Sequence, residues 1–364
     1  MRILHINCNY IGTTLHQLMI ENLEACGYGN EVFVPTYDKH LSVIVPNKNV
    51  CLCECFKKWD RLFFDYKQRK ICKAIEANLD VPKYDLIHAY TLFTDGNCAR
   101  TISKKNGIPY VVAVRNTDVN DFFRLMPHLR SRGVKTMLDA KAVFFLSEAY
   151  RNQVFEKYVP KKYRDIIQRK TYIIPNGIDD FWFDNAPTED NVIESKIKLI
   201  YAGRIDRNKN IPSIQAAMEF LRDKGYDVSL TVVGKVVDKK VFDIIEKDVY
   251  TECLAPQPKE TLIDLYRAHN IFVMPSFTES FGLVYAEAMS QGLPVIYSAG
   301  QGFDGQFPEG QVGYRVSSHN VKDIADGIEK VILEFDDIKQ NVVLSAKKFS
   351  WTKIVQQYDN IYKQ

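Results

Sequence analysis

The sequence lacks any long hydrophobic run, although 46% of its 364 residues are hydrophobic. None of its apolar segments approaches the roughly 18–20 residues that a membrane-spanning helix requires. The first residues, Met1 to Asn7, have the pattern of a strand and not that of a signal peptide. We therefore expect a cytoplasmic protein without a membrane span.

Cysteine is also sparse, with eight residues in the whole chain. They lie in apolar or helical stretches, which indicates reduced thiols and not a disulfide framework. Cys51, Cys53 and Cys55 could be ligands of a soft metal, but no His or second Cys pair lies nearby in the sequence to complete a site. We expect no metal site.

Net charge is small but unevenly distributed. The formal charge of +3 combines 27 Lys and Arg against 19 Asp and Glu in residues 1–180 (+8) with 21 against 26 in residues 181–364 (−5). This asymmetry predicts that the N-terminal half faces something anionic. Nucleic acid is not the expected partner, because the sequence contains no recognised nucleic-acid-binding module.

Short apolar strands alternate with helical segments through both halves of the chain. This pattern predicts an α/β fold with two parallel, doubly wound sheets. In the first half the expected strands are Ile3–Asn7, Glu31–Val34, Asp85–Ala89, Pro109–Val114, Ala142–Leu146 and Tyr172–Ile174. In the second half they are Lys198–Ala202, Ser229–Val233, Ile271–Met274, Pro294–Tyr297 and Gly313–Val316.

The length of the chain suits two domains. We predict an N-terminal domain at residues 1–183, a linker at 184–196, a second domain at 197–345 and a C-terminal helical segment at 346–364. The linker is expected there because its residues are polar, include Pro187 and show no periodicity.

The most informative segment follows the strand Ile271–Met274. Pro275 ends this strand, a polar loop follows, and a helix is expected to begin at Leu283. The backbone N–H groups of Phe281, Gly282 and Leu283 would then lie at a helix N-terminus, which binds anions readily.

Two carboxylates frame this predicted anion site. Glu279 lies at its mouth, and Glu287 lies about one and a half turns into the helix, so it could reach the same ligand from the side. Acids on both sides of a phosphate-sized space suggest a ligand with hydroxyls at both ends and phosphate in the middle. A nucleotide-sugar fits this description.

The segment 279–289, Glu-Ser-Phe-Gly-Leu-Val-Tyr-Ala-Glu-Ala-Met, resembles the signature of the family 4 retaining glycosyltransferases. Gly203, Arg204 and Lys209 resemble a second family segment, in which the Gly allows a tight turn and the two cations hold the donor diphosphate. Two more segments resemble family motifs in the family's order. They are Pro175-Asn176-Gly-Ile-Asp179, which adds Asn176 to the donor side, and Phe349-Ser-Trp351.

This resemblance implies two Rossmann-like domains that face each other across a cleft, the GT-B fold, with a last helix that crosses back to the first domain. It also implies a retaining transferase of the bacterial surface-polysaccharide type, with Glu279, Arg204 and Lys209 as catalytic residues. The donor would be a UDP- or GDP-linked sugar, and the acceptor a glycan or a polyprenyl-linked saccharide. We expect no cofactor and no dependence on a divalent metal, because no Asp-x-Asp pair follows a strand.

The N-terminal half departs from the family pattern. Gly12 resembles the glycine of the family's first loop, although an ordinary turn residue would look the same. Where the family has His-Gly-x-Asp, this chain has Arg115, Asn116 and Asp118, so an arginine replaces the histidine that contacts the donor sugar. Arg115 could donate to a sugar, a phosphate or an acceptor carboxylate. His88 could supply the missing imidazole, or it could simply pack at a strand end.

Two stretches, residues 57–70 and 122–135, combine aromatic residues with Lys and Arg. Such segments can lie on an anionic membrane. They can equally be amphipathic helices whose apolar stripe belongs to the core. The first interpretation predicts a peripheral contact with the inner face of the cell membrane.

Two other functions share this architecture. Loss of transfer through Arg115 and Asn116 would leave a nucleotide-sugar-binding pseudo-enzyme. A two-Rossmann nucleotide-sugar epimerase would have a similar fold, but it would lack the setting of Glu279 and Glu287. The retained Arg204, Lys209 and Glu279 favour a transferase.

Overall fold

The computed structural model describes residues 1–12, 14–38, 49–188 and 192–364. The chain forms two compact units: unit 1 is Met1–Pro175 with Ile354–Gln364, and unit 2 is Asn176–Lys353. The boundary between the units thus lies between Pro175 and Asn176. The sequence had suggested that the N-terminal domain extends to residue 183. Residues 189–191 of the predicted linker lie outside the described residues.

Unit 1 contains a seven-stranded parallel sheet in the order β3-β2-β1-β4-β5-β6-β7. Its strands are β1 (Arg2–Ile6), β2 (Gly29–Thr36), β3 (Val50–Glu54), β4 (Leu86–Ala89), β5 (Tyr110–Val114), β6 (Ala142–Phe145) and β7 (Thr171–Ile173). The sequence predicted all of these except β3. That strand pairs only with β2 and is partly exposed, so it lacks the apolar run of a buried strand.

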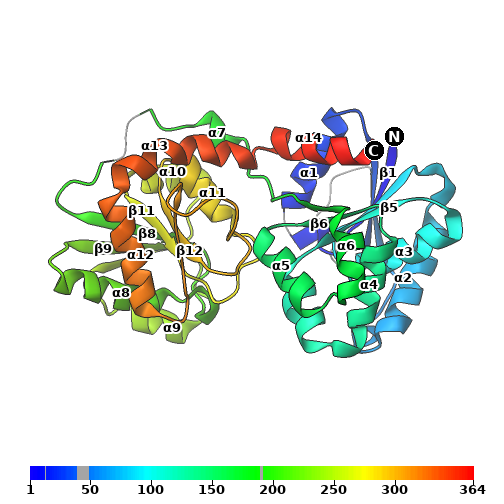
Figure 1. The fold of residues 1–364 in the computed structure, drawn as a ribbon, viewed down its shortest axis with the longest axis horizontal. Helices are drawn as coiled ribbons and strands as arrows, with labels where there is room; N and C mark the ends of the chain where they lie inside the picture. The colour runs from blue at the N-terminus through cyan, green and yellow to red at the C-terminus, as the bar shows by residue number, and fades with distance from the viewer. Residues whose placement is uncertain (13, 39–48, 189–191) are drawn as a thin grey trace. The chain divides into compact units, whose positions relative to one another are not determined.

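Helices cover this sheet, and α2, α3 and α4 lie side by side on one face (Figure 1). The α-helices of unit 1 are α1 (Thr14–Ala25), α2 (Phe64–Asn78), α3 (Asp95–Asn106), α4 (Arg130–Asp139), α5 (Glu148–Lys157) and α6 (Lys161–Gln168). Short 3-10 turns occupy Tyr10–Gly12, Lys58–Leu62, Val81–Lys83 and Pro127–Leu129, and a π-helix occupies Asp118–Phe123.

Unit 2 contains a six-stranded parallel sheet in the order β10-β9-β8-β11-β12-β13. Its strands are β8 (Ile197–Ala202), β9 (Val228–Val233), β10 (Thr251–Leu254), β11 (Ile271–Met274), β12 (Val295–Ser298) and β13 (Gly313–Val316). The unpredicted strand is β10, which is again a partly exposed edge strand.

The helices of unit 2 alternate with these strands. They are α7 (Phe181–Asp184), α8 (Ile211–Asp223), α9 (Lys239–Ile245), α10 (Lys259–Arg267), α11 (Leu283–Ser290), α12 (Val321–Leu333) and α13 (Phe335–Ala346). Turns of 3-10 helix occupy Arg207–Lys209 and Lys347–Phe349. The last helix, α14 (Trp351–Tyr362), starts in unit 2, and its residues from Ile354 onward belong to unit 1.

Both sheets are doubly wound, as predicted. The chain order reverses between β1 and β4 in unit 1 and between β8 and β11 in unit 2. Ligands of open parallel sheets bind beyond the carboxyl ends of the strands at such reversals. In unit 2, the loops that leave β8 and β11 carry Arg204, Lys209 and Glu279.

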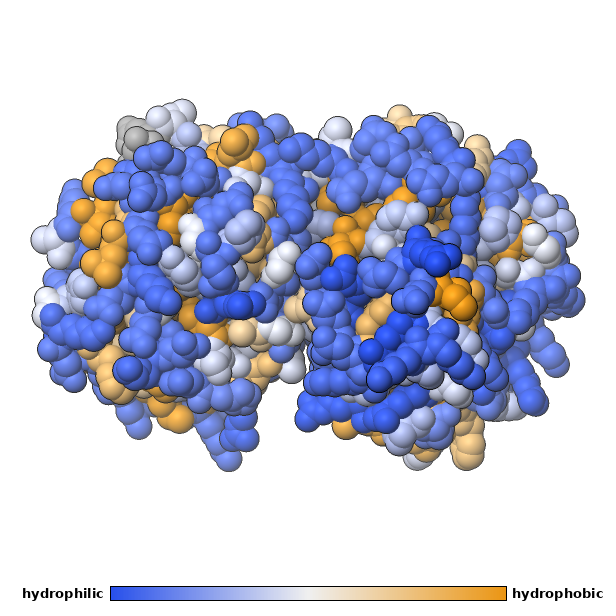
Figure 2. Space-filling model, viewed as in Figure 1, coloured by the Kyte–Doolittle hydropathy of each residue, from blue (hydrophilic) through white to orange (hydrophobic). Residues whose placement is uncertain are grey.

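The visible surface in Figure 2 is mainly hydrophilic, with small and separated apolar patches. Among the described residues, no helix combines the length and the apolar character needed to cross a bilayer.

Candidate functional site

Asn208 and Asn210 hold together the two loops at the chain reversal of unit 2. Asn208 Nδ2 donates to the Thr278 carbonyl at 2.8 Å, and Asn208 Oδ1 accepts from Thr278 N at 3.0 Å and from Thr278 Oγ1 at 2.7 Å. The Asn208 carbonyl also accepts from Phe277 N at 2.9 Å. The loop after β8 thus determines where the loop after β11 lies.

Asn210 adds a second connection. It has a left-handed backbone with φ 57°, the sole positive φ of a non-glycine residue in the described ranges. Its Nδ2 donates to the carbonyl oxygens of Pro275 at 3.1 Å and Ser318 at 2.7 Å. Asn tolerates this conformation better than most residues.

Lys209 and Glu279 form an ion pair across these two loops. Lys209 Nζ lies 2.6 Å from Glu279 Oε2, and both side chains are mostly buried, with 13% and 11% exposed. Glu279 Oε1 accepts from Ser280 N at 3.0 Å, and Gln301 Oε1 accepts from Glu279 N at 3.0 Å. The pair therefore has a fixed orientation before any ligand arrives.

Arg204 is the exposed cation of the same site. Its side chain is 64% exposed and lies 3.4 Å from Asp206, an ion pair too solvated to restrain it strongly. The turn below it is restrained, because Tyr201 Oη donates to the Arg204 carbonyl at 2.6 Å. The guanidinium can therefore move toward a ligand while its backbone stays in place.

Three positions at this site require glycine, two because another backbone segment lies close and one because of its left-handed φ and a neighbouring ring. A Cβ at Gly234 would lie 1.6 Å from the Gly203 carbonyl oxygen, and one at Gly302 would lie 1.8 Å from the Ser280 carbonyl oxygen. Gly282 has φ 78°, and a Cβ there would lie 2.5 Å from the Tyr285 ring. The sequence identified Gly203 and Gly282, but it did not indicate Gly234 or Gly302.

The start of α11 has the free amides that the sequence predicted. Gly282 precedes the first helical residue, Leu283. The N–H groups of Phe281, Gly282 and Leu283 have no hydrogen-bond acceptor within the described part of the chain. They are available to an anion, which the positive end of the helix dipole would also favour.

Glu287 lies on α11 and is partly buried. No cation forms an ion pair with it in the described ranges. Burial, with a smaller contribution from the charge of Asp179, raises the pKa of Glu287 to about 7. A carboxyl group that is half ionised near neutral pH can accept hydrogen bonds more strongly as the pH rises.

The two remaining motifs of unit 2 pair with each other. Ile178 forms a parallel bridge with Ser350, and Ile178 N donates to the Phe349 carbonyl at 2.9 Å. A Cβ at Gly177 would lie 2.6 Å from the Trp351 ring, so only glycine fits under that indole. Asn176, next to this bridge, is partly buried and also has interaction partners.

In unit 1, Gly12 ends the short turn that follows β1. Its part in binding the donor stays a prediction.

Arg115 is a half-buried residue with several partners. Its Nε donates to the Tyr90 carbonyl at 3.3 Å, and its side chain hydrogen-bonds that of Tyr358 on α14. Arg115 thus connects the C-terminal helix to the end of β5. The side chain that replaces the family's histidine has a structural role within unit 1.

Asp118 is completely buried. Its carboxylate accepts from the backbone N–H groups of Leu92 at 2.9 Å, Phe93 at 3.1 Å and Arg115 at 2.8 Å. Asp118 therefore holds the loops after β4 and β5 together, and no solvent-borne sugar reaches it in this conformation. Its expected contact with sugar or acceptor does not match this burial.

His88 is also fully buried. Its ring stacks on Tyr90 with centroids 4.5 Å apart, and its Nδ1 lies 2.6 Å from the Tyr362 hydroxyl of α14. Burial holds the pKa of His88 well below its usual range, so the imidazole is neutral. His88 therefore packs at the end of β4, which is the second of the two roles that the sequence left open. A fully buried imidazole is not placed to substitute for the missing histidine.

Comparisons with known proteins agree with this geometry. Residues 184–349 match the family described as glycosyl transferases group 1. The D-inositol 3-phosphate glycosyltransferase of Pseudarthrobacter chlorophenolicus is 27% identical over 296 residues, 74% of this chain and 68% of that protein. The capsular polysaccharide biosynthesis glycosyltransferase CapM of Staphylococcus aureus is 24% identical over 351 residues, 90% of this chain and 87% of that protein.

Solved structures share the fold. A sucrose-phosphate synthase from Thermosynechococcus elongatus superposes with a TM-score of 0.77 at 19% identity, covering 100% of this chain and 98% of the other. Anabaena HepE in complex with UDP and glucose superposes with a TM-score of 0.70 at 17% identity, covering 99% of this chain and 98% of the other.

The environment of Asp118 leads to a stability prediction. The substitution Asp118→Asn removes an acceptor oxygen and directs an amide toward backbone donors. We therefore expect the free energy of unfolding to fall by about 1–3 kcal/mol. Chemical denaturation at pH 7.5 measures this change. Asp121→Asn is the matched control, because Asp121 is exposed on the same π-helix. Equal stability of the two variants would contradict the role of Asp118 as a buried connection between loops.

Proposed function

Because this chain is a family 4 glycosyltransferase with the GT-B fold, we propose that it transfers a sugar from a nucleoside diphosphate to a glycan or lipid-linked saccharide acceptor, with retention of anomeric configuration. The observation that carries this proposal is the Lys209–Glu279 ion pair beside the free amides at the start of α11. The pair combines a cation for phosphate with an acid for the sugar in one fixed arrangement.

Departure of the diphosphate leaves negative charge on its β-phosphate oxygens. Lys209, Arg204 and the amides of residues 281–283 are the groups that we assign to stabilise this charge. Preorganised donors of this kind act strongly because they need no reorganisation during the reaction. We propose that they make a divalent metal unnecessary.

Glu279 would hold the hydroxyls of the donor sugar and stabilise the positive charge that develops on it. Lys209 Nζ, 2.6 Å from Glu279 Oε2, orients this side chain for that role. Glu287 would accept from the ribose hydroxyls of the nucleotide, together with the donor-side residues Gly203 and Asn176.

A uridine nucleotide is the donor that the comparisons favour. HepE was solved with UDP and with UDP-glucose, and a trehalose-6-phosphate enzyme of E. coli was solved with UDP-2-fluoro glucose. The name of CapM refers to capsular polysaccharide, which supports a role in cell-surface polysaccharide synthesis. We accordingly propose a cytoplasmic enzyme that uses a UDP-sugar.

The cations of the loop after β8 allow a kinetic test. Arg204→Ala and Lys209→Ala should each lower kcat for transfer by at least about 100-fold, the scale reported for loss of one charge-stabilising donor. Nucleoside diphosphate release is followed with acceptor present, in excess EDTA. Arg207→Ala is the control, since Arg207 is an exposed neighbour on the same loop.

Turnover abolished by EDTA would contradict metal independence. Wild type that binds donor without releasing diphosphate would indicate a pseudo-enzyme.

Glu287 predicts the pH dependence of donor binding. Its pKa of about 7 means that it is mostly protonated at pH 6 and mostly ionised at pH 8. If the ionised form binds the ribose, the KM for donor should fall as the pH rises through 7, by up to about tenfold. Glu287→Gln should raise the KM and remove the pH dependence between 6 and 8. A wild-type KM that stays constant over this range would refute the assignment.

We also propose that unit 1 contacts an anionic membrane. The beginning of the first basic stretch exposes large apolar side chains: Trp59 is 75%, Leu62 73% and Phe63 66% exposed. Directly after this stretch, Ile71 and Ile75 of α2 are fully buried, so the apolar face of that helix belongs to the core. Exposed aromatics between cations suit the interface of a bilayer.

Vesicle flotation tests the membrane contact. Wild type should float with vesicles containing anionic lipid at low salt and dissociate at high salt, because exposed charges are screened over about 8 Å at physiological ionic strength. The variant has four cations of the stretch changed to Glu: Lys57, Lys58, Arg61 and Lys67. The control has the same change at four exposed cations in or next to α5 and α6: Lys157, Lys161, Lys162 and Arg169, which directly follows α6. Equal flotation of the two variants would leave a soluble acceptor as the better assignment.

A further inference from the structure

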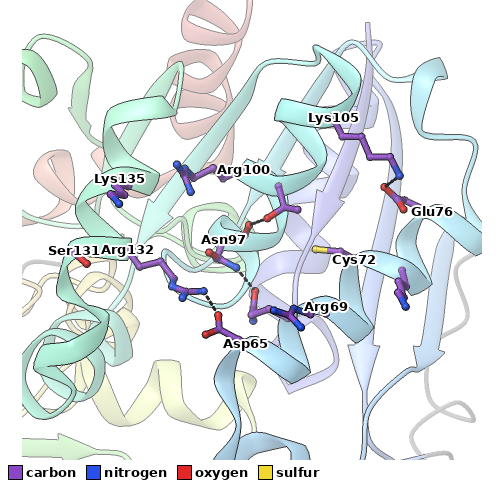
Figure 3. A pocket seen from close by; sticks show the side chains of 13 residues that line it. Asp65, Arg69, Cys72, Glu76, Asn97, Arg100, Lys105, Ser131, Arg132 and Lys135 are labelled. Carbon is purple, nitrogen blue, oxygen red and sulfur yellow. Dashed lines mark hydrogen bonds and ion pairs between the residues drawn. The ribbon is translucent and has the colours of Figure 1, made fainter.

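A second hollow lies in unit 1, between α2, α3 and α4 (Figure 3). Its volume is about 590 Å³, and it belongs to one unit alone. None of the residues assigned to the donor lines it. Six cations surround it: Arg69, Lys73, Arg100, Lys105, Arg132 and Lys135.

These cations exceed the nearby acids. Two carboxylates line the hollow, Asp65 and Glu76, and they pair with Arg132 and with Lys105. The lining residues alone therefore carry a net charge of +4. Arg100 also pairs at 2.6 Å with Asp139, which lies outside the lining, so three of the six cations remain without a carboxylate among the described residues.

The other three cations, Arg69, Lys73 and Lys135, have no ion-pair partner in the part of the chain that the structure describes. They are exposed and come from two different helices, α2 and α4. Figure 3 shows Arg69 on one side of the hollow and Lys135 on the other. A ligand between them would be approached by cations from both sides.

The inner wall of the hollow has a polar donor without a partner. Gln68 is 3% exposed, and its Oε1 accepts from Asn97 Nδ2 at 3.0 Å and from Cys98 Sγ at 3.0 Å. Its Nε2 is buried and has no hydrogen-bond partner. A buried amide donor without an acceptor is costly, and a ligand oxygen would satisfy it.

We propose that this hollow is a binding site for a phosphate or diphosphate group, separate from the donor site. A group with several acceptor oxygens and two or more negative charges can accept from the guanidinium and ammonium groups on the rim and from the Gln68 amide on the wall. The group could be carried by a soluble phosphate or by a phospholipid headgroup. The hollow adjoins the start of α2, where Phe63 and Tyr66 are exposed, so a headgroup could enter from a bilayer.

Calorimetric titration with sodium pyrophosphate tests the site. Pyrophosphate would also enter a donor diphosphate site, so every protein carries Arg204→Ala and Lys209→Ala. The protein with these two substitutions alone is the background protein. The pocket variant adds Arg69→Gln, Lys73→Gln and Lys135→Gln. The control variant adds the same change of charge in or next to α5 and α6, at Lys157, Lys161 and Arg169, which are also exposed.

Background and control proteins should bind one pyrophosphate, and the pocket variant should bind at least about tenfold more weakly.

A parallel flotation uses vesicles of phosphatidylcholine with and without phosphatidic acid. A loss confined to pyrophosphate identifies a soluble ligand, and a loss confined to phosphatidic acid vesicles identifies a lipid headgroup. Pocket and control variants that behave alike with both probes overturn the proposal. This result would leave the transferase assignment unaffected, since donor turnover is measured separately on the protein with Arg204 and Lys209 intact.

Discussion

The site in unit 2 depends on one buried ion pair, between Lys209 and Glu279. Burying two charges costs several kcal/mol each unless their geometry and remaining hydrogen bonds compensate. Here the compensation comes from the Ser280 amide and from loops held in register by Asn208 and Asn210. The pair is therefore oriented before the donor binds. Such preorganisation is what electrostatic catalysis requires, because the site does not have to reorganise as charge develops.

Much of the fold, and which residues lie together where the chain order reverses in unit 2, could be predicted from the sequence. Apolar runs indicated eleven of the thirteen strands in the described part of the chain, and both omissions, β3 and β10, are edge strands with partly exposed side chains. Glu279, Lys209 and the amides before α11 could be found because they are close in sequence to strand ends. Gly234 and Gly302 could not, because each is required by a backbone segment that lies far away in the chain.

Unit 1 was harder to predict for the same reason. The family motif suggested ligand contact for Asp118, and a place at the end of a strand suggested it for His88, yet both are fully buried. The surroundings of His88 and Arg115 come from distant residues: Tyr362 of α14 contacts His88, and Tyr358 of the same helix contacts Arg115. A sequence without its long-range contacts does not reveal that the C-terminal helix covers these positions. Arg115 replaces a family histidine in a place where it connects α14 to the sheet.

We propose above all that this enzyme transfers a sugar with retention of anomeric configuration, and that protein charges, not a metal, stabilise the departing diphosphate. Proton NMR of the anomeric signal tests it most directly, during turnover of a UDP-sugar with a saccharide acceptor in excess EDTA. The account predicts that the first product formed has the anomeric configuration of the donor, before any slow mutarotation. A first product of opposite configuration, or turnover that appears only when a divalent metal is restored, would contradict it.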